Sequence, residues 1–269
     1  PARYSTSMAG FGLIKAADQF DVIVVGAGNA ALCAAIAVLE KGASVLILEC
    51  APEEQRGGNS AFTGGAFRFA YDGVEQLKTL ADISDLEESA SDFGRYPETE
   101  FFSDLAELSR YRADPNLIEI VANQSLLTLQ WMRRQGVRFV PIYGRQSYKS
   151  GGKHVFWGHL VLEASGGGMG LVNALLARVA ALGAKIVYNH KVVDLIADGG
   201  RVCGVIAQTP DGDVALRARA VVLAAGGYHA NTAWRARYLG HGWDLAKPRG
   251  TRFNTGAAIE AALRKARTN

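Results

Sequence analysis

Two features near the start of the chain are typical of nucleotide binding. Gly26-Ala-Gly28-Asn-Ala-Ala31 follows a β-branched run and opens an apolar helical stretch from about Asn29 to Lys41. In such a turn Gly26 permits the tight bend, and Gly28 lets a pyrophosphate approach the free N–H groups of the helix start. Glu49 ends the next buried run, roughly the 20 positions later at which a carboxylate accepts hydrogen bonds from an adenosine ribose. The pattern predicts a dinucleotide site.

The alternative is that the glycines are purely structural and that Glu49 is a solvated carboxylate at a strand end. The motif also leaves open whether the dinucleotide is FAD or NAD. Two features favour FAD. A second glycine-rich loop, Arg56-Gly-Gly-Asn-Ser60 with Thr63-Gly-Gly65, follows Glu49 directly, and a β-meander precedes the last buried strand.

These motifs require a sheet to position them. The 269 residues are 49% apolar and 20% charged, which excludes a disordered chain. We predict an α/β fold: a doubly wound, Rossmann-like parallel sheet of the glutathione reductase type with an inserted antiparallel β-meander. The expected buried strands are 21–25, 45–48 and 220–224, the meander strands are 191–196, 201–208 and 214–218, and the main helices are about 29–41, 115–136, 170–182 and 257–267.

Charge and cysteine content exclude several other classes. A net charge of +3 without a dense basic block argues against nucleic acid. The longest apolar run, Ala30–Leu39, is too short to span a membrane. Cys33, Cys50 and Cys203 form no C-x-x-C pair, and residues 1–20, expected to be a tail, lack a secretory signal. We expect a cytoplasmic protein without a metal site.

Several motifs together resemble one flavoprotein family. They are VIVVGAGNAALCAA with Glu49, GGNSAFTGGAF, GGGMGLVNALL, VVLAAGGYHAN and WRARYLGHGWDLAKPRGTRFNTG. Over about Phe20 to Gly256 the chain resembles the FAD-dependent fumarate reductase/succinate dehydrogenase flavoprotein family. Its motifs are most similar to those of the tricarballylate dehydrogenases. The resemblance implies that residues 21–269 form an incomplete FAD-binding domain.

The resemblance also implies a set of cofactor contacts. Pyrophosphate contacts would come from the first turn and from the end of the last strand, and the ribityl chain and flavin ring would lie along the second loop. Val193, or its neighbour Val192, would lie by the adenine. The implied residues are Gly26, Gly28, Asn29, Ala30, Glu49, Arg56, Gly58, Asn59, Ser60, Thr63, Gly64, Gly65, Val193, Ala224, Ala225 and Gly226.

The chain departs from the family in two places. The second loop has no histidine for covalent attachment, so FAD is expected to bind non-covalently. Thr255-Gly-Ala-Ala lacks the family's Asp-Gly pair, and the substrate-binding and proton-transferring residues are expected beyond Asn269. The candidate carboxylate-binding residues in this chain are Arg145, His154, Arg249 and Arg252. The alternatives are surface roles for the arginines and packing or surface roles for His154 and His159.

The family resemblance implies an oxidoreductase that oxidises a carbon–carbon bond next to a carboxylate, as in tricarballylate to cis-aconitate. The expected partners are a small di- or tricarboxylate and an electron-accepting protein. We expect this chain to be a truncated flavin-binding part that alone binds FAD weakly or not at all and has no turnover. Two alternatives stay open: a non-catalytic flavin-binding or interaction module that forms homo-oligomers, and an NAD-dependent dehydrogenase.

Overall fold

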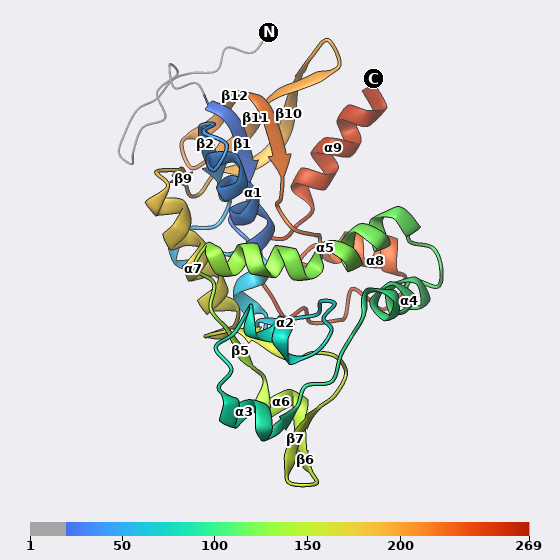
Figure 1. Cartoon of the computed structure of the whole chain (residues 1–269). Coiled ribbons are helices and arrows are strands. Elements are labelled where there is room, and N and C mark those ends of the chain that lie inside the picture. Colours follow the sequence, from blue (N-terminus) through green and yellow to red (C-terminus); the bar gives the residue numbers. More distant parts are fainter. Residues whose placement is uncertain (1–19, 269) are drawn as a thin grey trace. The chain divides into compact units, whose positions relative to one another are not determined.

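The computed structural model describes residues 20–268, and the chain divides into two compact units. The first contains the described residues up to Phe62 and from Leu175 onward, and the second is Thr63–Ala174. Figure 1 labels their helices and strands. The tail expected over residues 1–20 lies outside the described residues except for Phe20, which begins the first strand.

A six-stranded sheet organises the first unit. Its order is β10-β11-β12-β1-β2-β9. Neighbouring strands from β12 to β9 pair in parallel, and β10, β11 and the first half of β12 form an antiparallel meander. The predicted Rossmann-like sheet with an inserted meander is confirmed. The strands are β1 (Phe20–Val25), β2 (Val45–Leu48), β9 (Lys185–Val187), β10 (Lys191–Asp198), β11 (Arg201–Thr209) and β12 (Gly212–Leu223).

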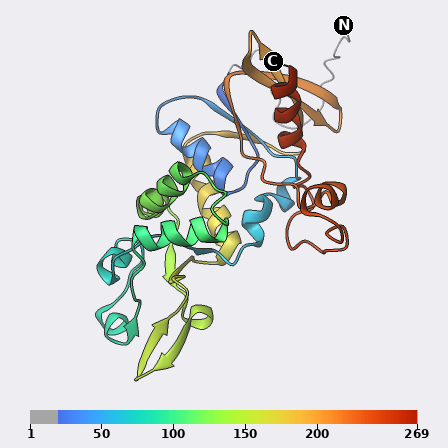
Figure 2. The ribbon, with the colours of Figure 1, turned by 90° about the vertical axis from the view of Figure 1, so that its right-hand side faces the viewer.

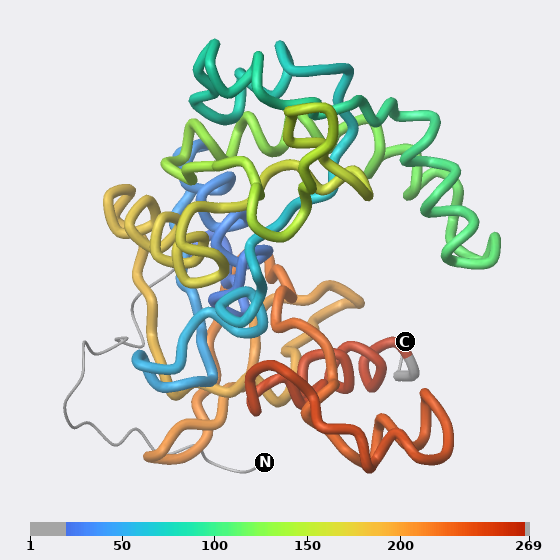
Figure 3. Tube along the Cα trace, turned by 90° about the horizontal axis from the view of Figure 1, so that it is seen from below, coloured from blue at the N-terminus to red at the C-terminus, as the bar shows by residue number. Residues whose placement is uncertain are grey.

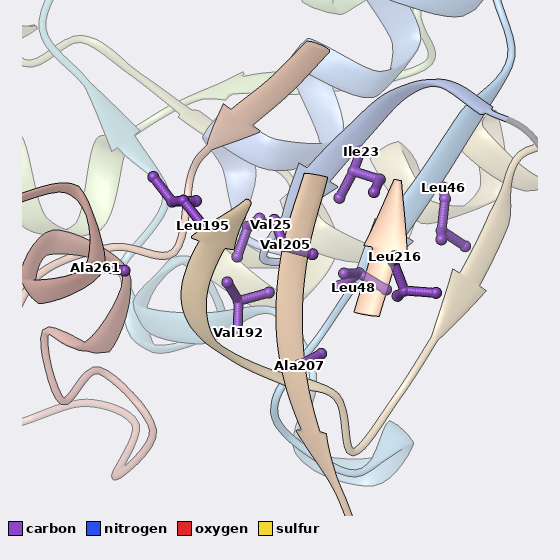
Figure 4. Packing of buried hydrophobic residues seen from close by; sticks show 10 residues of the cluster. All are labelled: Ile23, Val25, Leu46, Leu48, Val192, Leu195, Val205, Ala207, Leu216 and Ala261. Carbon is purple, nitrogen blue, oxygen red and sulfur yellow. The ribbon is translucent and has the colours of Figure 1, made fainter. Parts of the chain in front are cut away.

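The sequence of β1 and β2 explains why the sheet is covered on both faces. Both strands are nearly continuous Val, Ile and Leu, as expected of parallel strands buried on two sides. Ile23, Val25, Leu46 and Leu48 form one core cluster with apolar side chains of the meander (Figure 4). Val24 and Ile47 alternate with them and are fully buried, since α1 (Asn29–Leu39) packs on β1 and β2.

Strand β12 differs from the prediction. The sequence indicated two strands, 214–218 and 220–224, whereas a single strand runs from Gly212 to Leu223. It pairs antiparallel with β11 as far as Arg217 and parallel with β1 from Ala218. No glycine or proline interrupts the chain between Asp213 and Leu223, so nothing ends the strand at residue 219. The meander is therefore continuous with the parallel sheet.

Besides α1, the described residues place α7, α8 and α9 with this sheet. Helix α7 (Gly167–Ala181) passes from the second unit into the first, and α8 (Thr232–Leu239) was not predicted. The side chain of Asn231 caps α8 by accepting from the Trp234 N–H at 3.1 Å. Helix α9 (Ala257–Thr268) packs beside β10, and Figures 1 and 2 show it next to the meander.

The second unit contains short helices and two three-stranded sheets. The predicted long helix is α5 (Pro115–Arg134), which is capped by Asp114, has proline at its first position and packs against the unpredicted α4 (Glu98–Leu108). The sheets have the orders β3-β8-β5 and β4-β7-β6. The remaining elements are β3 (Ala66–Phe67), α2 (Val74–Lys78), α3 (Asp85–Ser89), β4 (Ser91–Asp92), β5 (Phe139–Pro141), α6 (Tyr143–Gln146), β6 (Ser147–Ser150), β7 (Lys153–Phe156) and β8 (Leu162–Ala164).

Candidate cofactor site

A cleft of about 380 Å³ opens in the first unit at the carboxyl ends of its parallel strands. This is within the size range of small-molecule sites and is the edge at which parallel sheets bind ligands. Five segments line it: the β1–α1 turn, the end of β2, the 3₁₀ segment Gly58–Phe62, the start of β10 and the end of β12. A sixth, between residues 251 and 259, leads into α9.

The β1–α1 turn depends on the absence of side chains. Gly26 has a φ of +108°, and a Cβ there would lie 2.6 Å from the carbonyl oxygen of Ala224 at the end of β12. A Cβ at Gly28 would approach the Ser60 hydroxyl to 3.4 Å. Both glycines line the cleft, so its floor is bare backbone that a phosphate can approach closely.

The start of α1 gives this part of the cleft a positive potential. The N–H of Asn29 donates to Ser60 Oγ at 2.9 Å, and the first intrahelical bond is from Leu32 to Gly28 at 3.0 Å. The N–H groups of Ala30 and Ala31 lie between them, in a first turn that carries no acidic residue. Unpaired N–H groups and the helix dipole favour an anion at this position.

Glu49 lines the cleft next to the β1–α1 turn and is only 4% exposed. Its Oε2 accepts from the Ala27 N–H and its Oε1 from the Ala51 N–H, both at 2.8 Å. Each carboxylate oxygen has two acceptor positions, so a ligand hydroxyl can still donate to Glu49. Burial, and then the neighbouring Glu49 charge, raise the pKa of the Cys50 thiol to about 12. Cys50 is therefore protonated at neutral pH and donates to Glu49 Oε1 at 3.3 Å.

The second glycine-rich loop contributes unevenly to this cleft. Gly58, Asn59 and Ser60 line it, whereas Arg56 does not and instead donates to the Glu53 carbonyl at 2.9 Å. Asn59 Oδ1 accepts from the Thr251 N–H at 3.0 Å. Asn59 thereby joins the 3₁₀ segment to the loop that precedes α9.

Thr63, Gly64 and Gly65 belong to the second unit and are organised within it. The guanidinium of Arg145 donates to the Gly64 carbonyl at 3.1 Å and forms an ion pair with Glu163. A Cβ at Gly64 would lie 2.6 Å from Arg145 Nη1, so this guanidinium occupies the space of a side chain.

At β10 and β12 the cleft meets backbone and small residues. Val192 lines the cleft, whereas Val193 does not, and its carbonyl accepts from Arg264 of α9. Ala224, Ala225 and Gly226 all line it. The side chain of Asn254 packs against Gly226, where a Cβ would lie 2.5 Å from Nδ2.

The sequence reasoning missed the lining contributed by the loop before α9. Thr251, Phe253 and Asn254 line the cleft, and Thr251 and Asn254 are buried polar residues. The stretch RGTRFNTG was singled out for its resemblance, but only its two arginines were considered as binding residues. The available signal was the presence of small polar residues directly before a helix start.

The candidate carboxylate-binding residues are distributed over both units. Arg249 and Arg252 are exposed and flank the cleft-lining Thr251, and the Arg252 guanidinium lies 5.0 Å from the centre of the Phe253 ring. His154 is in the second unit, with Nδ1 3.1 Å from Ser147 Oγ. Because Ser147 donates to the Tyr143 carbonyl, the imidazole is the donor to this hydroxyl and does not activate it. His159 stacks on Tyr96 at 4.2 Å.

Residues 20–268 contain neither a metal-ligand cluster nor a membrane-spanning helix. Within that range no three His, Cys, Asp or Glu side chains are grouped closely enough to hold a metal ion. None of the helices described there is both long and apolar enough to cross a membrane.

Comparison with known proteins decides which dinucleotide the cleft serves. Residues 21–268 match the family described as FAD binding domain. The chain belongs to this family. It is 30% identical over 220 residues to a vinyl phenol reductase of Lactiplantibacillus plantarum and 25% identical over 224 residues to an NADH:fumarate oxidoreductase of Klebsiella pneumoniae. A flavocytochrome c3 fumarate reductase in its open conformation is similar in structure, with a TM-score of 0.71 and 25% identity over 93% of this chain.

These findings confirm the resemblance to fumarate reductase flavoproteins, and FAD is the cofactor. They favour FAD over the NAD alternative. The match covers 80% and 83% of this chain but only 39% and 22% of the two relatives, and 41% of the flavocytochrome. This FAD-binding chain thus spans less than half the length of the relatives it matches.

Proposed function

We propose that this chain is the flavin-binding part of an oxidoreductase that moves hydrogen to or from a carbon–carbon bond next to a carboxylate. The observation that carries the proposal is the cleft itself: a glycine turn, an uncapped helix start and a buried carboxylate converge in a chain of the FAD binding domain family. We include a carboxylate in the proposal because one relative is named for fumarate, which is a dicarboxylate. Both relatives are named as reductases or oxidoreductases of unsaturated compounds.

The residues of the cleft fit the pyrophosphate and the adenosine ribose of an adenine dinucleotide. Gly26, Gly28, Asn29 and Ala30 would hold the pyrophosphate, with the Ala30 N–H as the donor because the Asn29 N–H already donates to Ser60 Oγ, and Glu49 would accept from the adenosine ribose. Ala224, Ala225 and Gly226 would close over the phosphates. When bound, FAD supplies hydride transfer, and the protein supplies binding and orientation. We propose non-covalent binding, because residues 51–65 contain no histidine.

The proposal also covers the substrate, the flavin contacts, the partner protein and the location in the cell. Tricarballylate is the substrate we propose, with cis-aconitate as product, because Arg249 and Arg252 flank the cleft-lining Thr251 and arginine pairs well with carboxylates. Thr63, Gly64 and Gly65 are proposed flavin contacts, and Arg56 and Val193 are proposed neighbours of the cofactor. We further propose an electron-accepting partner protein and, since all three cysteines are free, a cytoplasmic location.

Glu49→Gln tests the cofactor site. Loss of a charge-assisted hydrogen bond costs about 1.5–3 kcal/mol, so the Kd for FAD should rise about 10- to 100-fold. The matched control is Glu53→Gln, because the Glu53 side chain is 65% exposed and does not line the cleft. Quenching of flavin fluorescence measures both affinities, and circular dichroism checks the fold. Equal Kd values for the two variants would remove Glu49 from the site.

Turnover tests the reaction. The FAD-loaded chain is mixed with tricarballylate or succinate and a dye acceptor, alone and after joining to any coding sequence that continues past Asn269 in its gene. We expect no dye reduction by the chain alone and tricarballylate-dependent reduction by the longer product. Flavin binding without carboxylate-dependent reduction in either case would favour the alternative, a non-catalytic flavin-binding module that self-associates.

A further inference from the structure

One histidine that lines the cleft is not among the proposed FAD contacts. His190 lines the cleft beside Glu49, Cys50 and Lys191. Its backbone N–H donates to the carbonyl of Glu49 at 2.9 Å, which fastens the start of β10 to the end of β2. The imidazole therefore lies at the same end of the cleft as the buried carboxylate.

The backbone before His190 is held in an unusual conformation. Asn189 has a φ of +57°, in the left-handed region, and its N–H donates to the Ala51 carbonyl at 3.1 Å. Such conformations cost free energy and persist where the surrounding structure enforces them. The turn between β9 and β10 thus holds the backbone that carries His190 beside the end of β2.

The hydrogen bond of the ring determines its tautomer. His190 Nδ1 lies 2.7 Å from the carbonyl oxygen of Tyr188. A carbonyl oxygen can only accept, so Nδ1 carries the proton, and Nε2 of the neutral ring is an acceptor. Within residues 20–268 no hydrogen-bond partner is found for Nε2. Nε2 is therefore the nitrogen of this cleft-lining ring that can accept a further hydrogen bond.

This edge matches the chemistry of adenosine. Glu49 presents acceptor oxygens, and neutral His190 adds an acceptor nitrogen, whereas adenosine offers three donors: two ribose hydroxyls and the exocyclic amine. We propose that His190 is a second recognition residue for the adenosine half of FAD, accepting one of these hydrogens through Nε2, and that protonation of the ring abolishes this contact. The inference rests on the FAD site proposed above and adds a residue and a pH dependence to it.

Two neighbouring groups, Cys50 and Tyr188, do not account for such a pH dependence. Cys50 stays protonated, because its pKa is raised to about 12 by burial and by Glu49. Burial raises the pKa of Tyr188, with Glu53 adding to the rise and Arg56 opposing it, so this phenol also stays neutral. Glu49 and Lys191 are the other charged groups lining the cleft. Imidazole is the side chain that typically changes charge between pH 5 and 8.

The experiment uses two substitutions that separate hydrogen bonding from shape. His190→Phe keeps a flat ring without nitrogen, and His190→Gln keeps an acceptor that does not titrate. At pH 8 we expect the Kd for FAD to rise about two- to tenfold in His190→Phe and to stay close to wild type in His190→Gln. Between pH 8 and pH 5.5 the wild-type chain should lose affinity, and His190→Gln should lose markedly less. His241→Phe, at an exposed histidine of the same unit, is the control.

FMN, which lacks the adenosine half, is the second probe. Its Kd should be the same in wild type and His190→Phe. The proposal for His190 is overturned, while the FAD site stands, if His190→Phe binds FAD as tightly as wild type. It is also overturned if the substitution raises the Kd for FMN as much as the Kd for FAD. Failure of the wild-type chain itself to bind FAD would overturn the proposed function instead.

Discussion

At Gly26 a single missing methyl group determines whether the cofactor turn can form. The φ of +108° is unfavourable for other residues, and the Ala224 carbonyl lies 2.6 Å from the position of a Cβ. Strain and close packing therefore act at the same residue. Gly212 separates the two effects, because its φ is +118° but nothing lies within 4 Å of its Cβ position.

Gly26→Ala and Gly212→Ala should therefore differ in stability. Backbone strain costs about 1–3 kcal/mol at either position, and overpacking adds about 1–3 kcal/mol at Gly26 alone. Urea denaturation measures both free energies of unfolding. FAD affinity should fall only in Gly26→Ala, because Gly212 is outside the cleft. An equal loss of stability in the two variants would show that the contact with Ala224 has no energetic weight.

Arg235 of α8 shows how one element organises the loop that follows it. It is 6% exposed, and its guanidinium donates to the carbonyls of Trp243 at 2.9 Å, Ala246 at 3.0 Å and Asp244 at 3.3 Å, and also to that of His229. The loop runs from α8 to α9 and appears in red-orange in Figure 3. Its last residues line the cleft, so Arg235 also supports the cofactor site.

We expect Arg235→Met to lower the free energy of unfolding by about 3 kcal/mol or more. A hydrogen bond to a charged group contributes about 1.5–3 kcal/mol, and four carbonyls lose theirs. FAD affinity should fall as well. Arg237→Met is the matched control, because Arg237 is exposed and lies 5.3 Å from the Tyr238 ring, a contact that contributes about 0.5–1 kcal/mol. Thermal and urea denaturation distinguish them, and similar losses would contradict a clamping role for Arg235.

The proposed cofactor contacts are divided between the two units of the molecule. The pyrophosphate and ribose contacts lie in the first unit, and Thr63, Gly64 and Gly65 lie in the second. The loop of the second unit is held by Arg145 and by α7, since the Gly168 N–H donates to the Thr63 carbonyl at 2.9 Å. If the proposal is right, one bound FAD contacts residues of both units, so the prediction concerns the whole molecule.

Hydrogen exchange with two ligands tests this prediction. At 100 times Kd a ligand stabilises the native state by about 2.7 kcal/mol, enough for about 100-fold slower exchange. FAD and ADP should both protect residues 26–31 and 49–51, whereas only FAD should protect residues 63–65. The β6–β7 turn at Gly151 and Gly152 is the internal control and should not respond. Equal exchange at residues 63–65 with FAD and with ADP would exclude this loop from the flavin contacts.

The sequence by itself determined the sheet and the first half of the site. Runs such as Val45–Leu48 can only be buried strands, and the spacing of Gly26, Gly28 and Glu49 depends on local geometry that a βαβ unit imposes. Helices with clear periodicity and a strong cap, such as α5, were predicted for the same reason. Local patterns report interactions between residues that are close in sequence.

Only the tertiary structure decided the rest, because those contacts join residues far apart in the chain. Asn59 meets Thr251, and β12 changes partner without a break. Arg235 of α8 donates to carbonyls on both sides of the helix, at His229 and in the following loop. Val192 rather than Val193 lines the cleft in a strand whose register is set by β11, and His190 lies beside Glu49 because its N–H donates to the Glu49 carbonyl. Such long-range packing leaves no periodic signal in the sequence, so the complete lining of the cleft became visible only in the fold.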